Sequence, residues 1–181
     1  MGTNATPIIG IYAADPIHSS AGFAVKYMGV STFRATFDRL NATLKGGSDG
    51  ITLEGAAEVD SVSIHSPEQF RANVLGPEFF DAEARPQITF TASEVLLSDD
   101  GIALVRGALT IKGNTRQIVA QGTWSPPASD SSGKTRSHLG LEATINRRDF
   151  GIIWDAPLPS GGTALADEVT ITVELALVAT D

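Results

Sequence analysis

The sequence contains no cysteine, which excludes a disulfide scaffold and any mechanism that depends on a thiolate. It also has no apolar run long enough to span a bilayer as a helix. Residues 1–10 lack the basic start and apolar segment of a secretory signal, so we expect a cytoplasmic protein, or a secreted or periplasmic one whose signal was removed. Met1, Gly2 and Thr6 fit the N-myristoylation pattern, but this pattern often matches by chance, and we do not predict the modification.

Basic residues are scarce as well. The chain has 13 Lys and Arg against 21 Asp and Glu, which gives a formal charge of -8, and the two signs are interspersed. A nucleic-acid-binding protein needs clustered Lys and Arg to neutralise phosphates, so we expect no nucleic-acid partner. The same charge argues against docking on an anionic membrane by electrostatic attraction alone.

Few residues offer catalytic or metal-binding chemistry. His18, His65 and His138 lie far apart, with no partner at metal-ligand spacing, although His18 and His65 could still meet in space. Asp99 and Asp100 fall in a predicted turn, where solvated charge is the ordinary interpretation. The sequence therefore predicts no metal site, no cofactor and no catalytic residues.

Two motif matches fail on their context. Residues 46–50 satisfy the G-x-S-x-G pattern of a hydrolase, but that pattern must join a strand to a helix, and here it separates two strand patterns. Residues 128–135 come within one residue of a phosphate-binding loop, yet they follow Pro126-Pro127 and lead into another strand rather than a helix. We interpret residues 46–50 as a tight turn and 126–135 as a long polar loop.

Alternation of apolar and polar residues is the dominant pattern in this chain of 181 residues. It recurs in segments at 23–27, 33–37, 51–59, 88–92, 105–111, 139–145 and 169–177. One apolar and one polar face is typical of a strand in an antiparallel sheet with one buried side. The length fits one domain, residues 1–181.

The alternation changes parity twice, between Phe37 and Leu40 and between Val59 and Val62. A shift of one residue turns every side chain to the other face, so we expect a bulge or bend at each point. Turns are predicted at 46–50, 99–101 and 112–114 because these segments are rich in Gly, Asp and Asn.

One segment has a helical pattern. Ser66 as N-cap, Pro67 at the first position and Gln69 predict a capping box, with the helix ending by Gly76. Phe70, Val74 and Leu75 would share a face on the barrel.

The residues alone therefore predict an all-β antiparallel barrel of about eight strands with one short helix.

Several blocks, in order along nearly the whole chain, resemble the YceI-like, polyisoprenoid-binding protein family. The blocks are Asp15, His18, Ser19, Phe23, Val25, Met28, Gly29, Ser31 and Phe37; Phe79-Phe80-Asp81 with Pro86, Ile88, Phe90 and Ser93; Gly107, Leu109, Thr110, Ile111, Gly113, Thr115 and Arg116; Asn146, Arg147, Asp149, Phe150 and Gly151; and Asp167, Val169 and Ile171.

The resemblance implies an extended, lipocalin-like barrel, usually a homodimer, with a long-chain isoprenoid lipid in its lumen. Polyprenyl pyrophosphates and isoprenoid quinones are the ligands it implies. Inward-facing apolar residues are the candidates for contact with this ligand, although they could instead pack only against one another: Phe23, Val25, Phe37, Leu53, Phe90, Leu109, Ile111, Leu141, Ile145, Ile171 and Val173.

An anionic head group would need polar partners at the barrel mouth. Our candidates are Lys112, Arg116 and Arg147, with His18 and Ser19 as hydrogen-bonding partners. The structural alternatives are that Arg147 and Asp149 only pair to hold a bend and that Lys112 is a solvated turn residue. We expect a lipid carrier or store; an enzyme acting on such lipids and a filled barrel without ligand are the competing hypotheses.

Overall fold

Strands make up most of the structure, a computed structural model that describes residues 8–180. Met1, Gly2 and Thr6, which fit the myristoylation pattern, lie outside this range. Within it, no helix has the length and apolar character needed to cross a bilayer. The elements are β1 (Gly10–Ala14), β2 (Ser20–Tyr27), β3 (Ser31–Phe37), β4 (Leu40–Gly47), β5 (Gly50–Glu58), the 3-10 helix η1 (Val59–Ser61), α1 (Glu68–Leu75), β6 (Gln87–Leu97), β7 (Ile102–Ile111), β8 (Asn114–Ser129), β9 (Thr135–Asn146), the 3-10 helix η2 (Arg147–Phe150) and β10 (Leu165–Ala179).

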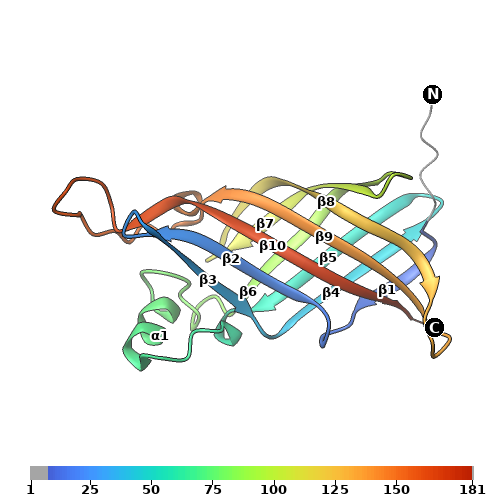
Figure 1. Ribbon diagram of the computed structural model, residues 1–181, viewed down its shortest axis with the longest axis horizontal. Coiled ribbons are helices and arrows are strands. Elements are labelled where there is room, and N and C mark those ends of the chain that lie inside the picture. Colours follow the sequence, from blue (N-terminus) through green and yellow to red (C-terminus); the bar gives the residue numbers. More distant parts are fainter. Residues whose placement is uncertain (1–7, 181) are drawn as a thin grey trace.

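The strands form one antiparallel sheet in the order β1-β4-β5-β6-β7-β8-β9-β10-β2-β3, and pairing of β1 with β10 closes it. The closed circuit has eight strands, as the sequence predicts, and the β2–β3 hairpin extends from β10 at one end (Figure 1). Closure gives β1 and β10 a partner on both sides, and β3 is left as the edge strand of the extending hairpin.

β1 and β2 are two segments of one interrupted strand, and β3 and β4 are two segments of another. β10 pairs with β2 over its first part and with β1 over Leu177–Ala179, so β1 and β2 lie along the same edge with a break between them. β3 and β4 also follow one another with a break between them, at Asp38-Arg39. The first predicted change of parity, between Phe37 and Leu40, falls at this break. The second change coincides with η1. Three further register shifts, in β6, β8 and β10, are not predicted by the sequence.

The helix lies where the sequence predicts it, but its start differs. Pro67 is the N-cap, no side chain caps the first turn, and Gln69 donates its side-chain hydrogen bond to Asn73 Oδ1 instead. The predicted capping box is therefore wrong, because Pro67 is extended and displaces the Ser66 hydroxyl from the first turn. Gly76 ends the helix, as predicted.

Only half of the polar loop predicted at 126–135 is a loop, and the rest is strand. β8 continues to Ser129 and β9 begins at Thr135, so only five residues connect them. Pro126 and Pro127 are accommodated because the register between β8 and β9 shifts between Ser125 and Ala128, where the ladder needs no N–H from them.

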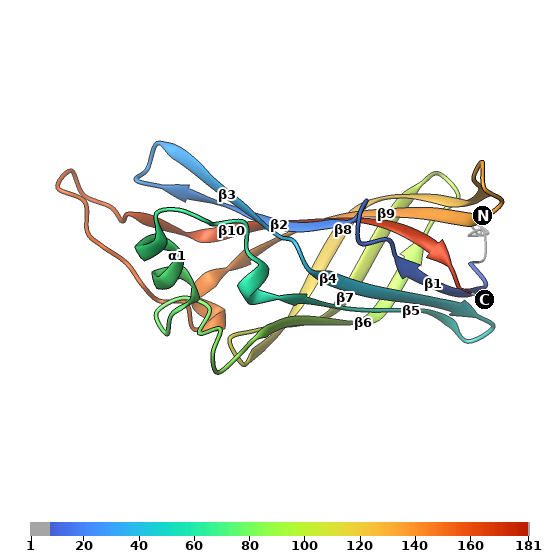
Figure 2. The ribbon, with the colours of Figure 1, turned by 90° about the horizontal axis from the view of Figure 1, so that it is seen from below.

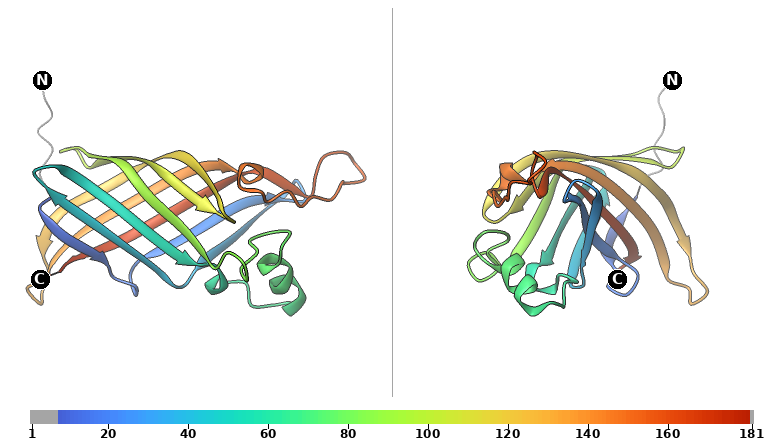
Figure 3. Two further views of the ribbon diagram at one scale, coloured as in Figure 1. Left: turned by 180° about the vertical axis from the view of Figure 1, so that it is seen from behind. Right: turned by 60° about the vertical axis from the view of Figure 1, so that its left-hand side comes forward.

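The interior divides into two parts along the barrel axis. At the end where β1 begins and β10 ends, large buried side chains fill the lumen: Tyr12, Leu44, Leu97, Trp124, Leu139 and Leu177. At the other end β2–β3 diverges from β5–β6, and α1 lies between them (Figure 2). Turned toward the viewer, this end shows α1 on one side and the segment after η2 on the other (Figure 3).

Candidate functional site

A cavity of about 850 Å³ occupies the half of the barrel nearest α1. It reaches the surface between α1, the β2–β3 hairpin and the segment after η2, where its lining residues Tyr27 and Phe70 are exposed. Its inner end stops at Ala120, Leu141 and Leu175, which pack against the filled part of the barrel. The cavity therefore opens at the α1 end and is closed at its inner end.

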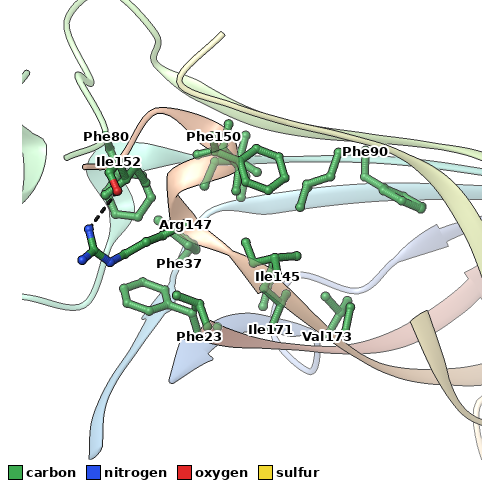
Figure 4. Close-up of a pocket in the computed structure, with 18 of the residues that line it drawn as sticks. Phe23, Phe37, Phe80, Phe90, Ile145, Arg147, Phe150, Ile152, Ile171 and Val173 are labelled. Atoms are coloured by element: carbon green, nitrogen blue, oxygen red, sulfur yellow. Dashed lines mark hydrogen bonds between the residues drawn. The ribbon is translucent and has the colours of Figure 1, made fainter. Parts of the chain in front are cut away.

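All eleven lumen candidates line this cavity, and Figure 4 shows Phe23, Phe37, Phe90, Ile145, Ile171 and Val173 among them. The register explains why: Phe23 and Ala143 both pair directly with Ile171, and Phe90 pairs with Leu109, so these side chains share one face of the sheet. Whether they contact a ligand remains a prediction. The set is Phe23, Val25, Phe37, Leu53, Phe90, Leu109, Ile111, Leu141, Ile145, Ile171 and Val173.

All eight phenylalanines of the chain line the cavity, and Trp154 joins them. Phe23 lies 6.0 Å from Phe80 between ring centroids, and Phe79 lies 5.4 Å from Trp154. Near the mouth, Phe33 and Phe70 meet edge to face at 5.7 Å. Ring pairs of this kind stabilise the wall beyond simple burial.

The alternation did not find the lining residues outside the strands, which include Phe70, Phe79, Phe80, Phe150, Ile152 and Trp154. They come from α1, the loop after it, η2 and the following segment, where no period of two exists. The signal that could have found them is composition, because phenylalanine is concentrated at 70–80 and 150 and absent from the closed end.

Arg147 lines the cavity, yet its guanidinium is already bound. It is 3% exposed and donates to the backbone carbonyl oxygens of Ala166, Ile152, Trp154 and Leu165 at 2.7–3.1 Å. Its Nη2 also lies 3.5 Å from Asp167 Oδ1. Burial, and then the charge of Arg148, lower the pKa of Arg147 below that of a free arginine. With its donors occupied, Arg147 holds the segment after η2 against β10. This role is structural, but the partners are backbone carbonyl groups and Asp167 rather than Asp149.

The other head-group candidates lie outside the cavity lining, so the expected grouping is not found. His18 and Ser19 lie in the break between β1 and β2, where His18 Nδ1 pairs with Asp15 and the Ser19 hydroxyl accepts from Ala176 N. The hydrogen bond with His18, followed by that from Ile17 N, lowers the pKa of Asp15 to about 2.

Lys112 and Arg116 lie on either side of the β7–β8 turn. Lys112 Nζ donates to the carbonyl oxygens of Pro77 and Gly151, so it ties the turn to two loops at the mouth. Arg116 is exposed and pairs directly with Leu109, a lining residue, so it shares the inward face of the sheet. Of the cations predicted for a head group, Arg116 is the one whose side chain the structure leaves exposed on that face.

The two segments that match catalytic or phosphate-binding motifs, residues 46–50 and 128–135, both lie at hairpin turns. Ser48 is exposed in the turn between β4 and β5, and residues 128–135 form the tip of the β8–β9 hairpin. Among residues 8–180, no three histidines, aspartates or glutamates gather as a metal site would require.

Comparison with known proteins places this fold. A model of the YceI-like domain matches residues 12–177. The UPF0312 protein SAS2572 of Staphylococcus aureus (strain MSSA476) is 29% identical over 161 residues, covering 87% of this chain and 91% of the relative. BcnA of Burkholderia cenocepacia has a similar structure, with a TM-score of 0.73 at 23% identity over 92% of this chain and 99% of its own.

A structure titled as a polyisoprenoid binding domain from Saccharophagus degradans is also similar, with a TM-score of 0.61 at 15% identity over 93% of this chain and 98% of its own. Identities this low show a shared fold alone. The family model, in contrast, matches nearly the whole barrel, from within β1 to within β10. The chain therefore belongs to the family of proteins with a YceI-like domain.

Proposed function

We propose that this protein carries or stores one long-chain isoprenoid lipid, of the polyprenyl pyrophosphate or isoprenoid quinone type, in its barrel. The observation that carries the proposal is the cavity whose wall holds all eight phenylalanines of the chain. The family, and the similarity to a structure titled as a polyisoprenoid binding domain, support it. The competing hypothesis, a barrel filled by its own side chains, explains the closed half but not the cavity in the other half.

The cavity has room for such a chain. At about 30 Å³ for each heavy atom, the share of one water in the liquid, a volume of about 850 Å³ accommodates about five isoprene units. Each unit buries five carbons and contributes up to about 4 kcal/mol. Micromolar binding needs about 8 kcal/mol, and the entropy of ordering the chain raises the number of buried units required.

The closed inner end fixes the orientation of the ligand. Trp124 and Leu139 close the barrel beyond Leu141, so the hydrocarbon enters from the α1 end and its head group stays near the mouth. Among the predicted cations we assign Arg116 to an anionic head group there, because its side chain is exposed on the inward face, although it lies outside the cavity lining.

Native mass spectrometry of the purified protein, with identification of solvent-extracted lipid, tests the proposal. We expect one isoprenoid per chain. Ala143→Phe, whose added ring fills the cavity, should weaken binding of an added polyprenol at least tenfold. Thr144→Phe, on the outer face of the same strand, is the matched control and should bind as the parent does. Protein that stays empty when offered polyprenyl and quinone ligands contradicts the proposal, and turnover of the bound lipid identifies an enzyme instead.

A further inference from the structure

Two hairpin tips project side by side at the mouth of the barrel (Figure 1). One is the turn of β2–β3, residues 27–33, and the other is residues 156–164 after η2. Met28 N donates to Ala164 O at 2.7 Å, and Tyr27 pairs with Leu165, so the tips form one unit, which we call the mouth tip.

The mouth tip presents apolar side chains to solvent. Val30 is 85% exposed, and Met28 is about half as exposed, at 41%. Ile153, at the base of the second tip, is 65% exposed. Met28 also has a φ of 57°, a conformation that favours Gly, Asn or Asp in a tight turn. Met28 is therefore an exposed apolar residue at a turn position that favours other residue types.

Charge is absent from the mouth tip and concentrated at its base. Residues 27–33 and 156–166 contain no charged side chain, although 19% of the chain is charged. Behind them, Arg148 pairs with Asp155 at 3.1 Å and with Asp167 at 2.7 Å. An uncharged apex above a charged base is the arrangement expected of a segment whose apex leaves water while its base stays wet.

The backbone of the second tip is suited to the same environment. Leu158 N bonds to Gly162 O, Gly161 N bonds to Leu158 O, and Ala164 N bonds to Ala156 O. These bonds matter because a backbone group that enters an apolar medium unpaired costs several kcal/mol in general.

We propose that the mouth tip inserts into the surface of a lipid bilayer and brings the cavity mouth to the membrane, where lipid is exchanged. This inference rests on the proposed function, because a long apolar chain can avoid water only if the mouth meets the membrane. Tyr27, Trp154 and Leu165 belong both to the base of the mouth tip and to the cavity lining, so the two are continuous. Because the net charge of the chain is -8, we expect insertion of apolar side chains, rather than attraction by anionic lipid, to hold the protein on the membrane.

Co-sedimentation of the full chain with phosphatidylcholine vesicles free of isoprenoid tests the inference. We expect binding that changes less than twofold between 50 and 500 mM NaCl and is no stronger on vesicles with anionic lipid. Val30→Asp combined with Ile153→Asp should weaken it at least tenfold. Ile17→Asp is the matched control, because Ile17 is 83% exposed but lies in the break between β1 and β2, and it should bind as the parent does.

Loading from detergent separates this inference from the proposed function. The Val30→Asp/Ile153→Asp variant should take up a fluorescent polyprenol from micelles as the parent does, but at least tenfold more slowly from vesicles. Brominated phosphatidylcholine should quench part of the parent's tryptophan emission, since Trp154 lies at the mouth and Trp124 at the closed end. If the parent loads from micelles but does not bind vesicles, the inference is wrong and the proposed function stands. If the two substitutions change only the oligomeric state, the mouth tip is a contact between copies, and the inference is again wrong.

Discussion

Trp124 donates a hydrogen bond of 2.8 Å from its indole Nε1 to the backbone carbonyl oxygen of Ser98. Ser98 belongs to the turn between β6 and β7, at the end of the barrel opposite α1. The bond fixes the indole in the barrel interior, where Trp124 is 4% exposed and packs with Leu139 and Leu177. Trp124 thereby contributes the bulkiest side chain of the closed end and helps to set how deep a ligand can reach.

Trp124→Leu should lengthen the cavity. The substitution removes the indole and its hydrogen bond, so we expect unfolding to become easier by about 2 to 4 kcal/mol. Affinity for longer polyprenols should rise relative to shorter ones, because the chain can extend toward the vacated space. A series of polyprenols of increasing length, titrated against parent and variant, measures this. Trp124→Phe, which keeps a ring, should give a smaller change, and an unaltered preference in Trp124→Leu would show that another residue sets the depth.

Arg147→Ala should destabilise the protein rather than change its head-group preference. Four carbonyl groups lose a charged donor, and bonds of this type contribute about 1.5 to 3 kcal/mol each in favourable cases, so we expect a loss of at least about 3 kcal/mol. Arg147→Lys should restore little, because one ammonium cannot reach donors spread over a planar fork. Thermal unfolding gives the stability. A normally stable variant that has lost its preference for polyprenyl pyrophosphate over the alcohol would instead establish a head-group role.

The wall of the cavity was predictable where strands supply it. An antiparallel strand turns every second side chain inward, so the alternation alone places Phe23, Leu109 and Ile171 in one lumen. The sequence did not distinguish the hollow half from the filled half, because Leu141 and Leu139 have the same parity and differ only in what lies opposite them. That difference depends on how far α1 and the β2–β3 hairpin hold the mouth open.

The role of Arg147 was not predictable in the same way. Its partners are backbone carbonyl groups of residues 152–166, which no side-chain pattern reveals. The position of His18 is a similar case, since it depends on a break between β1 and β2 that follows from pairing with β10 rather than from local residues. Contacts across the barrel decide both.

Gly122→Ala should be strongly destabilising. A Cβ atom at Gly122 would lie 1.9 Å from the carbonyl oxygen of Gly140 on β9, and backbone cannot move aside as a flexible side chain can. We expect a loss of more than about 3 kcal/mol, or failure to fold. Gly47→Ala is the matched control, because a Cβ atom at Gly47 would have no neighbouring atom within 4 Å, and it should change stability by less than about 1 kcal/mol. Urea unfolding of the two variants compares them directly, and equal midpoints would contradict the close approach of β8 and β9.

The stability of the protein should fall at acidic pH through a cluster that joins the β1–β2 break to the β8–β9 turn. Arg136 lies 3.3 Å from Asp15 and 2.5 Å from Asp130. The pKa of Asp15 is lowered to about 2, first by His18 and then by Ile17 N, and the pKa of Asp130 is lowered still further, first by the Ser132 hydroxyl and then by Arg136.

Both carboxyl groups bind protons less readily when folded than when unfolded, so they stabilise the fold above about pH 4. That contribution should disappear as the pH falls from about 4 toward 2, because the unfolded chain then takes up protons that the folded cluster refuses. Urea unfolding between pH 2 and 7 measures the dependence. Asp15→Asn combined with Asp130→Asn should lower stability at pH 7 and flatten the slope between pH 4 and 2. Asp49→Asn, in the exposed β4–β5 turn away from this cluster, should keep the parent slope. A double variant as steep as the parent would place the acid sensitivity in other carboxylates.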